Sequence, residues 1–259
     1  MMRKLFVLLW ALMTFVAAHA AAQQAVSPGD INAAGELRML SQRLAKSYVQ
    51  LGLEVVPAVA LEQLQDSITR FERNLERMQA LATVVPPAAA SIEHLRGNWS
   101  ALRAAVADPA DRTRALLASR RSLDVLESAD RLVLTLEAAA DSAGARRVNQ
   151  AGRLRMLSQR VVKAYMLYSW GADTAASRRE MDSAADEFAR GLTTLAALPD
   201  NTADMRAELS EIALQWEWLR TALSVEGAGS YRLVVAEAAD SILAATDRLV
   251  RLYEHAESR

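Results

Sequence analysis

The sequence predicts an all-α protein made of two tandem four-helix bundles, each up-down-up-down, that form a pseudo-dimer. The composition is rich in helix-forming residues, with only 10 Gly and 6 Pro in 259 residues. Apolar residues recur at helical spacing, and no segment alternates with a period of two, so we expect no strand. The chain also repeats itself at a shift of 117 residues.

The internal repeat is strongest at the start of each half. Residues 32–48 align with residues 149–165 at 12 of 17 identical positions, around the shared core AG-x-LRMLSQR. The same ungapped shift aligns Phe71 with Phe188, Leu75 with Leu192, and Trp99 with Trp216. An ungapped match of this length predicts a first helical bundle over residues 21–143 and a second over residues 144–259.

Proline, glycine and aspartate divide each half into four helical stretches. We expect helices near 29–54, 58–83, 88–107, 110–142, 146–170, 174–197, 202–224 and 230–257. Four helices joined by short connections are typical of a bundle. The connection around Gly144 decides how the bundles meet. A tight turn there places the two motif helices parallel and side by side, whereas one continuous helix from 110 to 170 would give an end-to-end rod.

The first twenty residues have the features of a secretory signal peptide. Two basic residues precede an apolar run that ends at Ala18, and residues 18–20 fit a small-x-small cleavage site. We therefore expect cleavage near Ala20 and export to the periplasm, with a retained membrane anchor as the alternative. No later segment is apolar enough to span a bilayer, so we do not expect an integral membrane protein.

Composition also excludes several classes of function. The chain has no cysteine, which excludes disulfides and thiolate metal sites. The formal net charge is −1 before the basic signal is removed, which argues against nucleic acid as a partner. The sequence contains no HExxH motif, nucleophile elbow or phosphate loop. We expect no enzymatic activity, metal or cofactor.

Arg38 and its equivalent Arg155 are the candidate ligand-binding residues. On a helix, Arg38 lies in a stripe of small residues with Ala34 and Ser41, so another helix can approach closely there. Neither arginine has a carboxylate at i±3 or i±4. If the two motif helices pack together, the guanidiniums repel each other, and a small planar oxyanion turns this repulsion into charge-assisted hydrogen bonds.

The alternative interpretation is that both arginines pair with acids on neighbouring helices. The acids in question are Glu127, Asp130, Asp247 and Glu254. The other basic residues of the motif helices lie off the small-residue stripe, and we interpret them as structural or solvated. They are Arg43, Lys46, Arg160 and Lys163.

Gly35 and Gly152 lie one turn before the two arginines. A glycine inside a helix costs up to about 1 kcal/mol relative to alanine. Its presence in both copies therefore indicates a close approach at this position, either by another helix or by a ligand.

The motif at residues 32–43 and 149–160 resembles the periplasmic signature of the nitrate/nitrite sensor histidine kinases. It also resembles the start of the N-terminal, PilJ-type domain of the type IV pilus methyl-accepting chemotaxis transducers. The resemblance implies a four-helix sensor bundle that pairs through its first helix, with the ligand held on the pair axis by the arginine of each LRM triplet and by backbone near the motif glycine. The implied ligand-binding residues are Arg38, Gly35, Arg155 and Gly152.

This chain departs from those receptors because we expect it to lack transmembrane helices and a signalling domain of its own. It also lacks the acid that the nitrate sensors carry at the start of the motif, which leaves the identity of the ligand open. We expect a soluble periplasmic sensory protein that binds a small oxyanion, nitrate or nitrite, and that works with a membrane receptor or signalling protein. The alternative is a structural or adaptor bundle that binds no small molecule and docks on a membrane receptor or a pilus or chemotaxis component.

Overall fold

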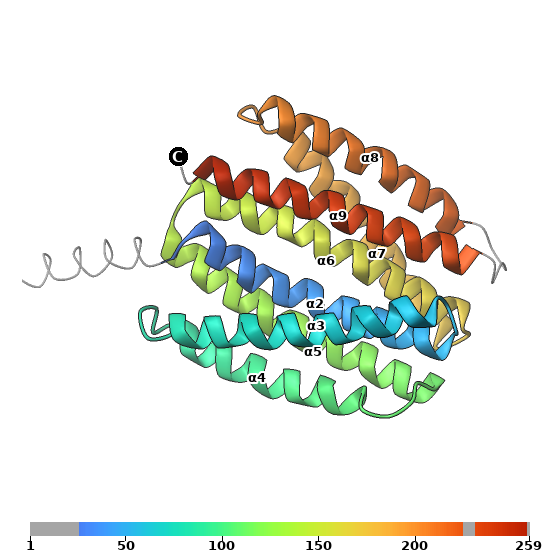
Figure 1. Cartoon of the computed structure of the whole chain (residues 1–259). Coiled ribbons are helices and arrows are strands. Elements are labelled where there is room, and N and C mark those ends of the chain that lie inside the picture. The colour runs from blue at the N-terminus through green and yellow to red at the C-terminus, as the bar shows by residue number, and fades with distance from the viewer. Residues whose placement is uncertain (1–25, 225–230, 258–259) are drawn as a thin grey trace, which may run out of the picture.

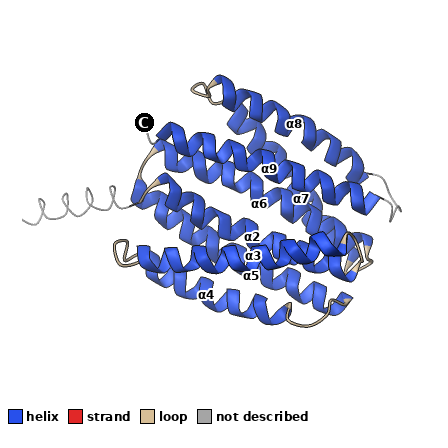
Figure 2. Cartoon of the chain, in the orientation of Figure 1, coloured by secondary structure: helices blue, strands red, loops and turns tan. Residues whose placement is uncertain are grey.

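The computed structural model describes residues 26–224 and 231–257, and every regular element within them is an α-helix (Figures 1 and 2). The first half contains α2 (Pro28–Gly52), α3 (Pro57–Leu81), α4 (Ala88–Ala105) and α5 (Arg112–Ala140). The second half contains α6 (Ala143–Ser169), α7 (Thr174–Ala196), α8 (Ala203–Ser224) and α9 (Tyr231–Glu257). The predicted all-α fold is confirmed. The predicted signal peptide lies outside the described residues.

Local capping chemistry sets the helix ends. At α2 the hydroxyl of Ser27 accepts from the backbone N–H of Asp30 at 3.2 Å, and the Asp30 carboxylate accepts from the backbone N–H of Ser27 at 2.9 Å. This reciprocal capping box satisfies donors that the first turn leaves free. Pro28 follows in the first helical position, where its missing N–H costs nothing. Helix α2 therefore starts at a well-defined residue, directly before the motif.

A two-residue turn connects the two halves. Asp141 adopts the left-handed conformation, with φ 42° and ψ 43°, and Ser142 caps α6 by accepting from the backbone N–H of Ala145 at 3.0 Å. Helix α6 therefore begins at Ala143 rather than near residue 146, and Gly144, which was expected to form the turn, lies inside the first helical turn. The alternative of a continuous helix from 110 to 170 is wrong, because the chain reverses at this turn.

Helices α2 and α6 lie parallel and side by side in the middle of the molecule (Figure 1). In the first half α3 and α5 flank α2, and α4 lies outermost. The second half repeats this order with α7 and α9 around α6, and α8 outermost. The two motif helices have neighbours on nearly all sides, so their polar residues are buried along with their apolar ones.

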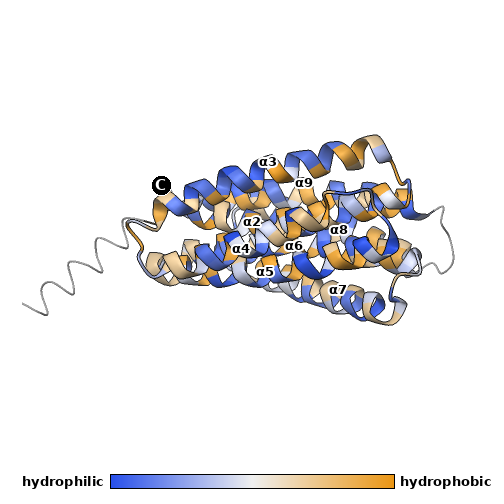
Figure 3. Ribbon diagram, turned by 90° about the horizontal axis from the view of Figure 1, so that it is seen from below, coloured by the Kyte–Doolittle hydropathy of each residue, from blue (hydrophilic) through white to orange (hydrophobic). Residues whose placement is uncertain are grey.

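The other helices are amphipathic. Figure 3 shows hydrophobic and hydrophilic residues interspersed along each of them, as expected for helices that bury one face. In the part of the chain that the structure describes, none of the helices combines the length and the apolar character needed to cross a membrane.

Two aromatic stacks close the bundles. The rings of Phe71 and Trp99 stack with centroids 3.7 Å apart, and those of Phe188 and Trp216 stack at 4.2 Å. The first stack joins α3 to α4 and the second joins α7 to α8, which are the most loosely packed neighbours within each half. Helix α4 packs mainly on α5 and α8 mainly on α9, and each stack adds a contact from the outermost helix to its other neighbour.

We predict that Trp216→Ala lowers the free energy of unfolding by about 3–5 kcal/mol, because it leaves a large cavity between α7 and α8. Trp218 provides a matched control on the same helix, since 68% of its surface is exposed against 3% for Trp216. Trp218→Ala should change the free energy of unfolding by no more than about 0.5 kcal/mol. Urea denaturation measures both values, and equal losses would contradict the packing described.

Candidate functional site

Arg38 and Arg155 meet across the interface between α2 and α6. Both are buried, with 1% and 3% of their surfaces exposed. A Cβ atom built on Gly35 would lie 3.3 Å from Nη2 of Arg38 and 4.0 Å from Nη2 of Arg155. A Cβ atom built on Gly152 would lie 3.4 Å from Nη2 of Arg155 and 3.7 Å from Nη2 of Arg38. The structure thus brings all four candidate ligand residues together, with both guanidiniums between the two glycines.

The guanidinium of Arg38 donates hydrogen bonds to residues of both repeats. Its Nη1 donates to Oδ1 of Asp130 on α5 at 2.6 Å. Its Nη2 donates to Oδ1 of Asn149, on α6 of the other repeat, at 2.7 Å. The side-chain nitrogen of Asn149 in turn donates to Glu137 on α5 at 2.5 Å, which fixes the amide so that its oxygen faces the arginine.

Arg155 has the same surroundings in the second half. Its Nη1 donates to Oδ1 of Asp247 on α9 at 2.8 Å, and its Nη2 donates to Oδ1 of Asn32 on α2 at 2.6 Å. Asn32 donates to Glu254 on α9 at 3.0 Å. The two networks are related by a pseudo-twofold axis between the motif helices. The pairing of both arginines with acids, which was the alternative interpretation, is therefore present.

Sequence reasoning missed the two asparagines and Glu137 as parts of this network. A signal for all three was available. Asn32 and Asn149 begin the two copies of the motif, and Glu137 aligns with Glu254 under the shift of 117 residues. A polar residue that recurs in both copies, on a helix face that must be buried, needs a polar partner there.

Burial is the main electrostatic influence on the site. It lowers the pKa of Arg38, an effect that Asp130 opposes by its charge and its hydrogen bond and that Arg153 and Arg155 reinforce. Arginine nevertheless stays charged in proteins. The Nε atoms of Arg38 and Arg155 are buried and have no hydrogen-bond partner. Each guanidinium therefore keeps a buried donor that a bound anion can satisfy.

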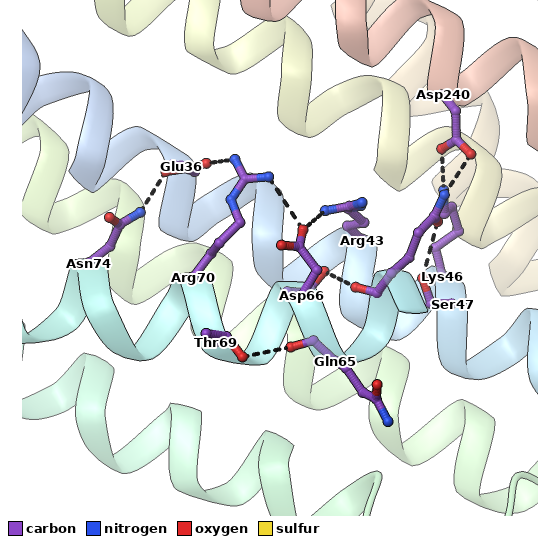
Figure 4. Close-up of polar contacts among 12 residues, drawn as sticks. Glu36, Arg43, Lys46, Ser47, Gln65, Asp66, Thr69, Arg70, Asn74 and Asp240 are labelled. Carbon is purple, nitrogen blue, oxygen red and sulfur yellow. Dashed lines mark hydrogen bonds and ion pairs between the residues drawn. The ribbon is translucent and has the colours of Figure 1, made fainter. Parts of the chain in front are cut away.

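The other basic residues that the sequence singled out on the motif helices form ion pairs away from this site; they are Arg43, Lys46, Arg160 and Lys163. Arg43 pairs with Asp66 at 2.5 Å, and Asp66 also pairs with Arg70, which contacts Glu36 (Figure 4). These contacts form a chain of charges along α2 and α3. Their role is structural, as one of the two interpretations expected.

Lys46 and Lys163 are fully buried, each with 0% of its surface exposed. A solvated role for these two residues is therefore wrong. Lys46 pairs with Asp240 at 2.9 Å, and Lys163 pairs with Glu180 at 3.0 Å. Their place off the small-residue stripe does not bring them to the surface, because further helices cover α2 and α6 on their other faces.

The larger surface grooves lie elsewhere. One of about 670 Å³ separates α7 from α8 and is lined by Leu192 and Trp216. Another of about 450 Å³ lies beside Trp218 and Tyr231, between α8 and α9. Neither includes a candidate ligand residue. Over residues 26–224 and 231–257, no group of three or more His, Cys, Asp or Glu side chains could hold a metal ion.

Comparison with known proteins gives one curated relative and one family. The methyl-accepting chemotaxis protein McpN of Pseudomonas aeruginosa is 33% identical over 153 residues, which is 53% of this chain and 28% of that protein. The chain therefore matches little more than a quarter of the length of this relative. No solved structure matches the chain.

The family model described as the type IV pili methyl-accepting chemotaxis transducer N-terminal domain, PilJ, matches residues 20–132 and again residues 138–251. The two matches cover most of the chain, and each contains one motif helix with its arginine. The chain therefore belongs to the PilJ family and carries two tandem copies of its domain.

Proposed function

We propose that this protein is a periplasmic sensory protein that binds a small planar oxyanion, nitrate or nitrite, between α2 and α6. In this proposal Arg38 and Arg155 hold the anion, and the backbone at Gly35 and Gly152 gives it room. The protein is non-enzymatic and passes its ligand state to a membrane receptor or another signalling protein.

One observation carries this proposal. Two buried guanidiniums from equivalent helices converge between two glycines, and each has an Nε donor without an acceptor. Leaving a buried donor unsatisfied costs about 1–3 kcal/mol, and more when the group is charged. An anion that accepts from both Nε atoms removes this cost twice. Membership of a family of chemotaxis transducer sensory domains supports a binding role over a purely structural one.

The export of the protein is part of the same proposal. It rests on the basic start, apolar run and small-x-small site of the first twenty residues.

The second candidate is an adaptor bundle that binds no small molecule and docks on a membrane receptor or a chemotaxis component. Two observations favour it. Asp130 and Asp247 already neutralise the arginines. Helices α8 and α9 also expose large apolar side chains, with 64% of the Leu214 surface and 68% of the Trp218 surface accessible. A binding measurement on the anion separates the two candidates.

We predict that the purified chain without its signal binds nitrate or nitrite in calorimetry and that Arg38→Ala weakens binding by about 1.5–3 kcal/mol, the range for a charged hydrogen bond. Arg155→Ala should have the same effect. The double variant should lose less than the sum of both, because one substitution already breaks the shared clamp. Arg43→Ala is the control, since this arginine lies on the same helix and pairs with Asp66 instead. If nitrate and nitrite give no more heat than chloride does, the adaptor function is favoured.

We also predict that Gly35→Ala weakens anion binding by about tenfold, roughly the loss of one hydrogen bond, because the new methyl group lies 3.3 Å from Nη2 of Arg38 and forces this atom to move. Gly97→Ala is the matched control, because a Cβ there meets nothing within 4 Å. It should raise the free energy of unfolding by about 0.5–1 kcal/mol, the usual gain for alanine in a helix, and leave binding unchanged. Unchanged binding in Gly35→Ala would place the anion elsewhere.

A further inference from the structure

Each repeat buries one lysine in the same position of its motif helix. Lys46 on α2 and Lys163 on α6 are equivalent under the shift of 117 residues, and both side chains are fully buried. Each has one carboxylate within ion-pair distance. The two carboxylates do not come from equivalent positions, although the arginine networks next to them are symmetric.

The acid beside Lys46 comes from the other repeat. Oδ1 of Asp240 on α9 accepts from Nζ of Lys46 at 2.9 Å (Figure 4). Gln63, on α3 of the same repeat as Lys46, donates to the second oxygen of Asp240 at 2.7 Å. Lys46 therefore lies beside one acid from the opposite repeat and one neutral amide from its own.

The acid beside Lys163 comes from its own repeat. Oε1 of Glu180 on α7 lies 3.0 Å from Nζ of Lys163. From the opposite repeat, Oε1 of Gln42 accepts from Nζ at 2.8 Å and the hydroxyl of Ser122 on α5 lies 3.1 Å from it. The residue after Ser122 is Leu123, which carries no charge.

These positions correspond pairwise. Under the shift, Gln63 aligns with Glu180 and Leu123 aligns with Asp240. Lys46 thus has its acid, Asp240, on the opposite repeat, whereas Lys163 has its acid, Glu180, on its own repeat. Each lysine has one acid, but the two acids stand at different positions of the repeat.

We infer that these four positions make the motif-helix face of each repeat complementary to the other repeat and not to a second copy of itself. In a pair of two first repeats, each buried Lys46 would lie beside Gln63 and Leu123, with no acid. In a pair of two second repeats, each Lys163 would lie beside both Glu180 and Asp240.

Both mismatches are costly because the lysines are buried. A buried ammonium without a counter-charge destabilises a protein strongly, and a surplus buried carboxylate is also unfavourable. Each hypothetical self-pair contains its mismatch twice, once on each side of the axis. The arginine networks cannot make this distinction, because Asp130 and Asn149 align with Asp247 and Asn32. The partner of each face is therefore the other type of repeat, and the lysine positions select it.

The electrostatics of the two lysines agree with this picture. Burial lowers the pKa of Lys46, and Asp240 opposes the shift; burial likewise lowers the pKa of Lys163, and Glu180 opposes it. Burial raises the pKa of Glu180, but Lys163 and Arg160 outweigh this and hold it below its ordinary value.

Substitutions in the full chain reproduce each hypothetical environment. Asp240→Leu with Glu180→Gln gives the second repeat the residues of the first, so both lysines lose their acid. Gln63→Glu with Leu123→Asp gives the first repeat the residues of the second, so both lysines have two acids. Gln63→Glu with Asp240→Leu keeps one acid per lysine, but it moves the acid beside Lys46 from α9 of the opposite repeat to α3 of its own repeat.

Thermal unfolding followed by circular dichroism measures the outcome. Asp240→Leu alone should lower the unfolding midpoint by about 4–10 °C. This is less than the loss of a fully buried ion pair would cause, because the Asp240 side chain is partly exposed. Adding Gln63→Glu should recover more than half of that loss. The double variant Asp240→Leu with Glu180→Gln leaves the lysines without an acid, and Gln63→Glu with Leu123→Asp gives each lysine two acids. Each double variant should have a lower unfolding midpoint than either of its single substitutions. Glu237→Leu, at an exposed acid one turn earlier on α9, is the control and should change the midpoint by less than about 2 °C.

The proposal is overturned if Gln63→Glu fails to rescue Asp240→Leu, because the acid would then not be transferable between the two positions. If Asp240→Leu does not fold, Leu123→Asp added to Glu180→Gln provides the mirror test and should restore more than half of the midpoint lost in Glu180→Gln. Glu180 also pairs with Arg160 at 3.2 Å, so some of its loss will not return. A mirror double no more stable than Glu180→Gln would likewise overturn the proposal.

Discussion

The structure depends on burying charged residues between two parallel helices. Helices α2 and α6 supply an arginine and a lysine each to the interior, and between Leu37 and Gly52, and throughout α6, they contain no acid. A buried cation needs a counter-charge, so carboxylates must come from other helices. Asp130 on α5, Glu180 on α7, and Asp240 and Asp247 on α9 meet this need. The flanking helices are thus tied to the motif helices by charge as well as by apolar packing.

The two kinds of buried cation serve different ends. The arginine networks obey the pseudo-twofold axis, place Nη2 of each guanidinium between Gly35 and Gly152, and leave both Nε atoms without acceptors. Such symmetry suits a single small ligand on the axis. The lysines break the symmetry by exchanging one acid between the repeats, while each keeps a single counter-charge. A duplicated pair of domains can in this way keep symmetric arginine networks and still distinguish its two halves.

Much of the fold and the pairing of the candidate site residues could be predicted from the sequence, because the internal repeat shows which positions are equivalent. The shift of 117 residues identified the two halves and the motif arginines, and it aligned the aromatic residues that the structure shows to be stacked. Helix ends were predicted within a few residues, except where Ser142 caps α6 ahead of Gly144. The burial of Lys46 and Lys163 could not be predicted from the motif helices alone, because it depends on how α7 and α9 cover α2 and α6. The role of Asn149 needed the geometry of the opposite repeat, since its amide bonds to Arg38 across the interface.

The most direct test of the shared anion site observes the two Nε–H groups themselves. Arginine Nε–H signals in a ¹H–¹⁵N spectrum can be assigned to Arg38 and Arg155 with the variants Arg38→Lys and Arg155→Lys. We expect nitrate or nitrite to shift both signals together along one saturation curve, whereas chloride at equal concentration should shift neither, and the Arg43 signal should stay unchanged. If neither signal moves at saturating nitrate and nitrite, or if only one of the two does, the arginines are structural partners of Asp130 and Asp247 and do not share an anion.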